Sequence, residues 1–117
     1  MDHADDRPVL DWDAAVAELG SESMAREIAI IFIDECGDLV ERVRTAIAQG
    51  DHQSLHLAAH TLKGSGRVFA AERLADAAWQ LEQMGNNKTL AGAETALRDL
   101  EAEAHAVVQA LRKRVTG

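Results

Sequence analysis

Apolar residues recur along most of this chain at intervals of three and four positions, the spacing of one face of an α-helix. No segment alternates apolar and polar residues over the length of a useful strand. The pattern therefore predicts five helices: a short one between Asp11 and Gly20, a long one ending near Gln49, and three more over residues 52–69, 71–84 and 89–114.

Residues with strong capping preferences mark the expected helix ends. The candidate N-caps are Asp11 or Asp13, Ser21 or Ser23, and Asp51. The candidate stop signals are Gly20, Gly50 and the run Gly85-Asn86-Asn87. The pair Gly50-Asp51 joins a stop to a start, which is typical of a tight connection between antiparallel helices.

The apolar faces predict how the helices pack. The face of the second helix comprises Met24, Ile28, Ile31 or Phe32, Cys36, Leu39, Val43 and Ile47. The last helix carries a bundle seam of Leu90, Ala93, Leu97, Leu100, Ala104, Val107 and Leu111. Four long amphipathic helices with short connections predict an all-α fold, an antiparallel up-down four-helix bundle with a short N-terminal capping helix.

Composition supports this fold and indicates one domain. The chain has 22 alanines, 12 leucines and no tyrosine in 117 residues, a length that suits a single core. We expect a flexible N-terminal lead at residues 1–9 and one domain over residues 10–115. Cys36 has no partner within the chain and the acidic start does not resemble a signal peptide, so we expect a cytoplasmic monomer.

The charge balance narrows the classes of partner. Twenty acids against 12 lysines and arginines give a formal net charge of −8, which disfavours nucleic-acid binding. The longest dense apolar run, residues 28–33, is far shorter than the roughly 20 residues of a membrane span. We therefore expect neither nucleic acid nor a membrane as partner.

The third helix separates into a buried and an exposed face. Its inward stripe comprises Leu55, Ala58, Leu62, Ser65 and Phe69. His60 lies on the opposite, solvent-facing side, with Lys63 three and Gly64 four residues further on. A neutral imidazole at neutral pH is a nucleophile that can accept a phosphoryl group, and Lys63 is placed to offset the added charge. Arg67 extends this basic local field.

Glycine inside an exposed helix costs about 1 kcal/mol relative to alanine. Gly66 faces the core flank, where close helix packing explains it. Gly64 faces outward, so we infer that its missing side chain opens a depression where another protein can approach His60.

The stretch Ala59-His60-Thr61-Leu62-Lys63-Gly64-Ser65-Gly66 closely resembles the signature of histidine-containing phosphotransfer (HPt) domains. Further matching positions are Phe32, Ala46-Ile47, Gly50-Asp51, Leu55, Ala71, Leu74 and Leu81-Glu82, and the resemblance covers about residues 10–112. The chain departs from the common pattern at Gly66, Val68 and Ala70-Ala71, where serine or alanine, asparagine and Gly-Ala are frequent. These departures leave His60, Lys63 and Gly64 untouched.

The resemblance implies a phosphoryl carrier without its own kinase activity or cofactor. It implies that His60 accepts a phosphoryl group from a receiver-domain aspartate and passes it to another response-regulator receiver, with Mg²⁺ held by the partner. It also implies that Lys63 steadies the phosphoryl group and that Gly64 gives the partner room. The expected partners are receiver domains and a hybrid sensor histidine kinase.

The sequence is also compatible with two alternative functions. Histidines at 52, 56 and 60 repeat every four residues, as in some zinc sites, but they fan over about 80° and this helix supplies no further ligand. A docking module that never carries phosphate is the other alternative, with Leu57 beside His60 as part of an apolar patch. His56 is expected to be a solvated neighbour that touches the partner.

Overall fold

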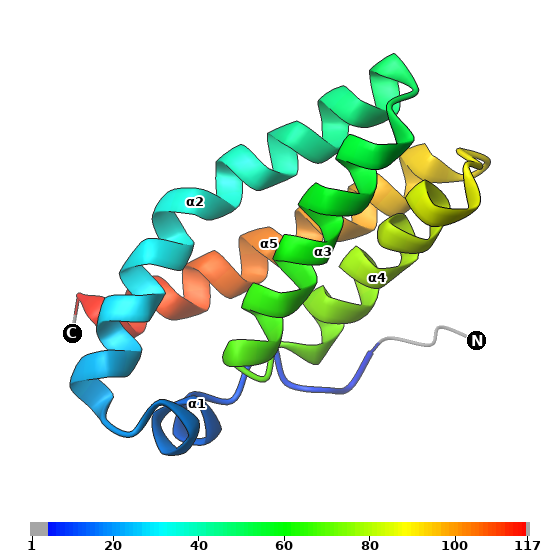
Figure 1. The fold of residues 1–117 in the computed structure, drawn as a ribbon. Coiled ribbons are helices and arrows are strands. Elements are labelled where there is room, and N and C mark those ends of the chain that lie inside the picture. Colours follow the sequence, from blue (N-terminus) through cyan, green and yellow to red (C-terminus); the bar gives the residue numbers. More distant parts are fainter. Residues whose placement is uncertain (1–4, 117) are drawn as a thin grey trace.

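The computed structural model describes residues 5–116, and it contains five α-helices (Figure 1). They are α1 (Trp12–Leu19), α2 (Glu22–Gln49), α3 (His52–Val68), α4 (Glu72–Asn87) and α5 (Ala93–Val115). The four long helices run side by side, whereas α1 lies across the end of the bundle at which α3 turns into α4. The fold is all-α, as predicted, with α1 as the short N-terminal helix.

Side-chain caps set the starts of the first three helices. The carboxylate of Asp11 accepts a hydrogen bond from the Ala14 amide, and the hydroxyl of Ser21 accepts one from Met24. Asp51 caps α3 in the same way through the Ser54 amide. Gly20 and Gly50 end α1 and α2 in the left-handed conformation, so these predicted boundaries are confirmed.

The predicted end of the fourth helix is wrong, and so is the predicted start of the fifth. Helix α4 continues through Gly85 to Asn87, and α5 begins only at Ala93, after Gly92 in a left-handed conformation. Gly85 has a different role from a stop signal. A Cβ there would lie 2.7 Å from the His52 carbonyl oxygen and 2.8 Å from the His56 amide nitrogen, so its absence lets α4 approach the α3 backbone.

The core is built around aromatic rings near α1 and small side chains elsewhere. Phe69 is fully buried, with Trp12 stacked on it at 6.4 Å and Phe32 edge-on at 5.8 Å between ring centroids. Cys36 is buried in the same core, and burial raises the pKa of its thiol to about 11. Cys36 therefore acts as a small apolar core residue.

The predicted inward face of α2 is only partly correct. Met24 is 43% exposed, while Ala25 and Ala29 are fully buried; of the alternatives Ile31 and Phe32, Phe32 is the buried one. A single stripe assumes one neighbour, but α2 packs against α1, α3 and α5 along its length. The buried face therefore follows different residues in different parts of the helix.

The chain before α1 lies against the α3–α4 hairpin. The Asp11 amide donates to the Phe69 carbonyl at 2.9 Å, and Arg7 forms ion pairs with Asp5 and with Asp76 of α4. Positions 1–4 of the expected flexible lead fall outside the described residues. Among the helices that the structure describes, none is long and apolar enough to cross a membrane.

Candidate functional site on α3

His60 lies in the middle of α3 and points away from the core. Its side chain is 61% exposed, whereas Ala59 and Leu62 beside it in sequence are fully buried. The ring is nevertheless held in place, because Nδ1 lies 2.7 Å from Oε2 of Glu82 on α4. A carboxylate can only accept a hydrogen bond, so Nδ1 carries the proton in the neutral ring and Nε2 keeps its lone pair.

Glu82 is a buried carboxylate that joins the two helices of the site. Its side chain is 6% exposed, and it also forms a 2.6 Å ion pair with Lys63 through Oε1. Burial raises the pKa of Glu82, but the close contacts with the Lys63 ammonium group and the His60 ring outweigh this effect and hold the pKa below its usual value. Glu82 is therefore ionised at neutral pH.

The sequence pattern alone did not single out Glu82. It entered only as part of the family signature, and its signal is one acidic residue directly after an inward leucine of α4. The contact joins residues 22 positions apart on two helices. A helical wheel of α3 cannot show such a partner, because it describes one element at a time.

Lys63 is less accessible than its outward placement suggested. Its side chain is only 14% exposed, because the ammonium group reaches inward to Glu82. The three side chains thus form one network, in which the carboxylate of Glu82 lies between His60 and Lys63. The network places a positive charge close to the imidazole while neutralising the buried carboxylate.

The two glycines of α3 have the different environments that the sequence indicated. A Cβ at Gly66 would contact Leu74 at 3.3 Å, so Gly66 permits close packing of α3 on α4. A Cβ at Gly64 would meet no atom within 4 Å in the described part of the chain. Gly64 and Arg67 instead border an open hollow of about 370 Å³ between α3 and α1, which also involves Glu18.

The sequence predicted a solvated His56, and the structure shows a side chain that is 32% exposed and partly packed against its neighbours. Its ring stacks on that of His60, with 5.9 Å between centroids and 17° between planes. Its Nδ1 is buried, lies 4.0 Å from Oε2 of Glu82, and has no hydrogen-bond partner among residues 5–116. His56 is thus part of the same cluster, with one nitrogen left unsatisfied.

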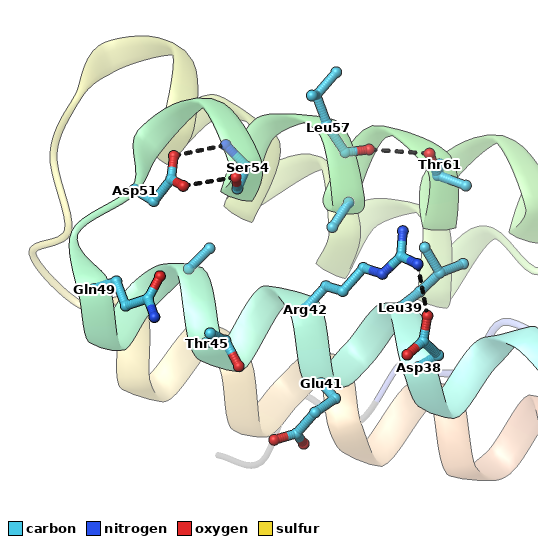
Figure 2. Close-up of a pocket in the computed structure, with 12 residues that line it drawn as sticks. Asp38, Leu39, Glu41, Arg42, Thr45, Gln49, Asp51, Ser54, Leu57 and Thr61 are labelled. Atoms are coloured by element: carbon cyan, nitrogen blue, oxygen red, sulfur yellow. Dashed lines mark hydrogen bonds and ion pairs between the residues drawn. The ribbon is translucent and has the colours of Figure 1, made fainter.

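Leu57 occupies the other flank of His60 and is 56% exposed. It lines a groove of about 380 Å³ between α2 and α3 (Figure 2). Arg42 and Asp38 of α2 form a 3.0 Å ion pair on the opposite wall of that groove. The apolar side chain predicted beside His60 is therefore accessible from solvent.

The fold does not bring further metal-ligating side chains to the three histidines of α3 among the described residues. Within the described residues, no group of three or more histidine, cysteine or acidic side chains could hold a metal ion. The carboxylate nearest to the histidines is already paired with Lys63. The arrangement instead suits an imidazole that reacts at its outer nitrogen.

Comparison with protein families decides the identity of the domain. The family model described as "Hpt domain" matches residues 27–112, which include all of α3 and α4. The chain belongs to the Hpt family. As an Hpt domain it is a phosphotransfer protein of phosphorelay signalling, a phosphoryl carrier domain. Hpt domains interact in phosphorelays with receiver domains and hybrid kinases.

Solved structures agree with the Hpt fold. Histidine-containing phosphotransfer protein B (HptB) from Pseudomonas aeruginosa PAO1 superposes with a TM-score of 0.84 at 24% identity, over 93% of this chain and 96% of that chain. The HPT domain of an Hpt sensor hybrid histidine kinase from Shewanella gives 0.81 at 20% identity, over 92% and 94%. At these identities the likeness establishes the fold. No curated protein sequence matches the chain.

Proposed function

We propose that His60 is the residue of this Hpt domain that carries the phosphoryl group. In this proposal Nε2 of His60 accepts the group from an aspartyl phosphate of one receiver domain and delivers it to the aspartate of another. The observation that carries the proposal is the 2.7 Å hydrogen bond from Nδ1 to Glu82, which leaves Nε2 as the unprotonated nitrogen on an exposed ring.

The proposed transfer conserves atoms and charge without a further reactant. The Nε2 lone pair forms the N–P bond as the P–O bond of the acyl phosphate breaks, and the aspartate carboxylate leaves with the electron pair. The proton on Nδ1 stays in place, so the phosphorylated ring becomes an imidazolium. Glu82 already accepts a hydrogen bond from that proton and stabilises the positive charge as it develops.

The neighbouring residues support the approach of a partner. Lys63 provides positive charge beside the reacting group, and the absence of a side chain at Gly64 leaves the approach from α1 open. Leu57 and Arg67, both exposed, flank His60 on opposite sides and are proposed contacts for the receiver. The Mg²⁺ ion that neutralises the transferring group is expected on the receiver, which leaves this domain to position the nucleophile.

Transfer from a phosphorylated receiver tests the proposal. The wild-type protein should acquire an acid-labile, base-stable phosphoryl group, whereas His60→Gln should remain folded and unlabelled. His105→Gln, an exposed histidine on α5, is the matched control and should be labelled as the wild type is.

Label on His60→Gln would refute the site assignment. If no receiver labels the wild-type protein while binding is retained, the domain acts as a docking module. If His60→Gln binds the receiver more weakly and the wild-type protein binds without acquiring label, the histidine serves affinity rather than chemistry.

A further inference from the structure

We propose that His56 takes up a proton when His60 is phosphorylated, and that it then donates a hydrogen bond from Nδ1 to Glu82, so that retention of the phosphoryl group depends on pH. This inference rests on the proposed function of His60. It gives His56 the role of a positioning residue that acts through Glu82.

The first observation is the unsatisfied nitrogen of His56. Nδ1 is buried and lies 4.0 Å from Oε2 of Glu82, too far for a hydrogen bond, and no other described group pairs with it. A buried polar atom without a partner destabilises the state in which it occurs. A movement of about 1 Å would bring it into hydrogen-bond range of the carboxylate, provided that Nδ1 carries a proton.

The second observation is the charge of the cluster. Before transfer, Lys63 and Glu82 neutralise each other, so with a neutral His60 ring the cluster has no net charge to attract a further cation. After transfer, His60 bears one positive charge on its ring and close to two negative charges on the phosphoryl group. The cluster then has a net charge of about −1, which a protonated His56 neutralises.

The surroundings of His56 contain few other charges. Glu82 is the ionisable group that faces it from α4, and Gly85 of α4 contributes only backbone contact with α3. On α3 itself the ionisable neighbours are His60, stacked at 5.9 Å, His52 one turn earlier, and Lys63 beyond Glu82. The new charges after transfer are therefore the positive charge on the stacked ring of His60 and the larger negative charge of the phosphoryl group on its Nε2, and together they are net negative.

The transfer step and the proton step balance separately. The phosphoryl group moves from the receiver aspartate to Nε2 of His60, as written above. His56 then binds one proton from solvent and becomes an imidazolium, and it releases that proton when the phosphoryl group leaves. No oxidant, reductant or metal bound to this chain is required.

Histidine NMR on the unphosphorylated and phosphorylated protein provides the direct test. The ring-proton shifts of His56 are followed between pH 5.5 and 8.5, with His105 as an internal control. We expect phosphorylation to raise the titration midpoint of His56 by about 0.5–1 unit and to leave that of His105 in place. An unchanged midpoint for His56 would overturn the inference.

A pair of variants tests the consequence for phosphoryl transfer. The equilibrium constant for transfer from a phosphorylated receiver is measured across the same pH range for the wild type, His56→Phe and His56→Gln. Protonation of His60 and of the receiver affects the wild type and both variants alike. It therefore cancels when the equilibrium constant of each variant is divided by that of the wild type. We expect the advantage of the wild type to grow about three- to tenfold from pH 8.5 to 5.5.

The two variants separate stacking from proton uptake. Phenylalanine keeps an aromatic ring against His60, and glutamine keeps a polar group near Glu82, but neither binds a proton. A ratio that is independent of pH for both variants contradicts the inference while leaving His60 as the carrier. A wild-type protein that no receiver labels removes the proposed function and this inference together.

Discussion

At the scale of single residues, the buried carboxylate of Glu82 is the feature that turns an exposed histidine into a defined nucleophile. Without it, the proton of a neutral His60 would exchange between the two ring nitrogens. With it, the 2.7 Å hydrogen bond selects Nδ1 for the proton and fixes the direction of the ring. Lys63 keeps Glu82 ionised, so the three residues act as one unit.

The substitution Glu82→Gln tests that unit. The amide retains the shape of the side chain but loses the charge that stabilises the phosphorylated ring, and it leaves Lys63 without its counter-ion. We expect the rate of phosphoryl transfer to fall about 10- to 100-fold, measured by single-turnover transfer from a phosphorylated receiver. Glu103→Gln, which removes the carboxylate paired with Arg73 on the far side of α4, is the control and should transfer at the wild-type rate. Equal rates for Glu82→Gln and the control would contradict the role of Glu82.

At the scale of the helices, the predicted helix ends agree with the structure where local capping interactions set them, and they differ where packing between helices sets them. The caps at Asp11, Ser21 and Asp51 and the stop at Gly50 depend on neighbouring atoms. The sequence predicted Asp51 and Gly50 directly, and it offered Asp11 and Ser21 as one of two candidates each. The sequence did not predict the end of α4 correctly, because Gly85 lies inside the helix and against the α3 backbone instead of ending the helix. Helix packing also explains why the sequence pattern did not single out Glu82, since the role of Glu82 depends on which helix packs beside α4.

Gly64 and Gly37 form a matched pair within α3 and α2. Both are exposed, and an added Cβ at either meets no described atom within 4 Å. Alanine at each position should therefore stabilise the protein by about 0.5–1 kcal/mol, measured by urea unfolding. Only Gly64→Ala should slow phosphoryl transfer, and Gly64→Glu should slow it further, because only position 64 borders the approach to His60. Unchanged transfer by Gly64→Glu would remove this explanation of the glycine.

The turn between α3 and α4 contains a correctable strain. Ala70 has a φ of 53°, in the left-handed region that disfavours residues with a Cβ. Ala70→Gly should raise the free energy of unfolding by about 0.5–1 kcal/mol, after allowance for the greater freedom of glycine in the unfolded chain. Ala71→Gly is the control and should destabilise the protein, because Ala71 is buried with a φ of −86°. Destabilisation by both changes would contradict the assigned strain.

At the scale of the whole molecule, the bundle packs α3 against α4 so that the His60 ring is held by Glu82 and is exposed to solvent. Ion pairs tie α5 to both of its neighbours, through Arg44 of α2 with Glu101 and through Arg73 of α4 with Glu103. The sequence predicted this architecture because each helix carries its own apolar face. It could not predict the charged network inside the site, because that network exists only after α3 and α4 have packed.

The network also links global stability to pH. The pKa of Glu82 lies below its ordinary value near 4.5, so the folded state binds this proton less readily than the unfolded state does. Its contribution to stability is present above about pH 4.5 and is lost as the pH falls through the lower, folded-state value. Urea unfolding of the wild type should therefore show a steeper loss of stability between pH 5 and 3 than that of Glu82→Gln. Parallel profiles would show that Glu82 carries no such linkage.

NMR of the phosphorylated protein with ¹⁵N in its histidine rings identifies the phosphorylated nitrogen directly. The phosphorus–nitrogen coupling identifies the nitrogen that bears the phosphoryl group, and the ring shifts report the proton on the other. We expect coupling to Nε2 of His60 with a proton retained on Nδ1. Coupling to Nδ1 of His60, or to any other histidine, would contradict the assignment of His60 and the role given to Glu82.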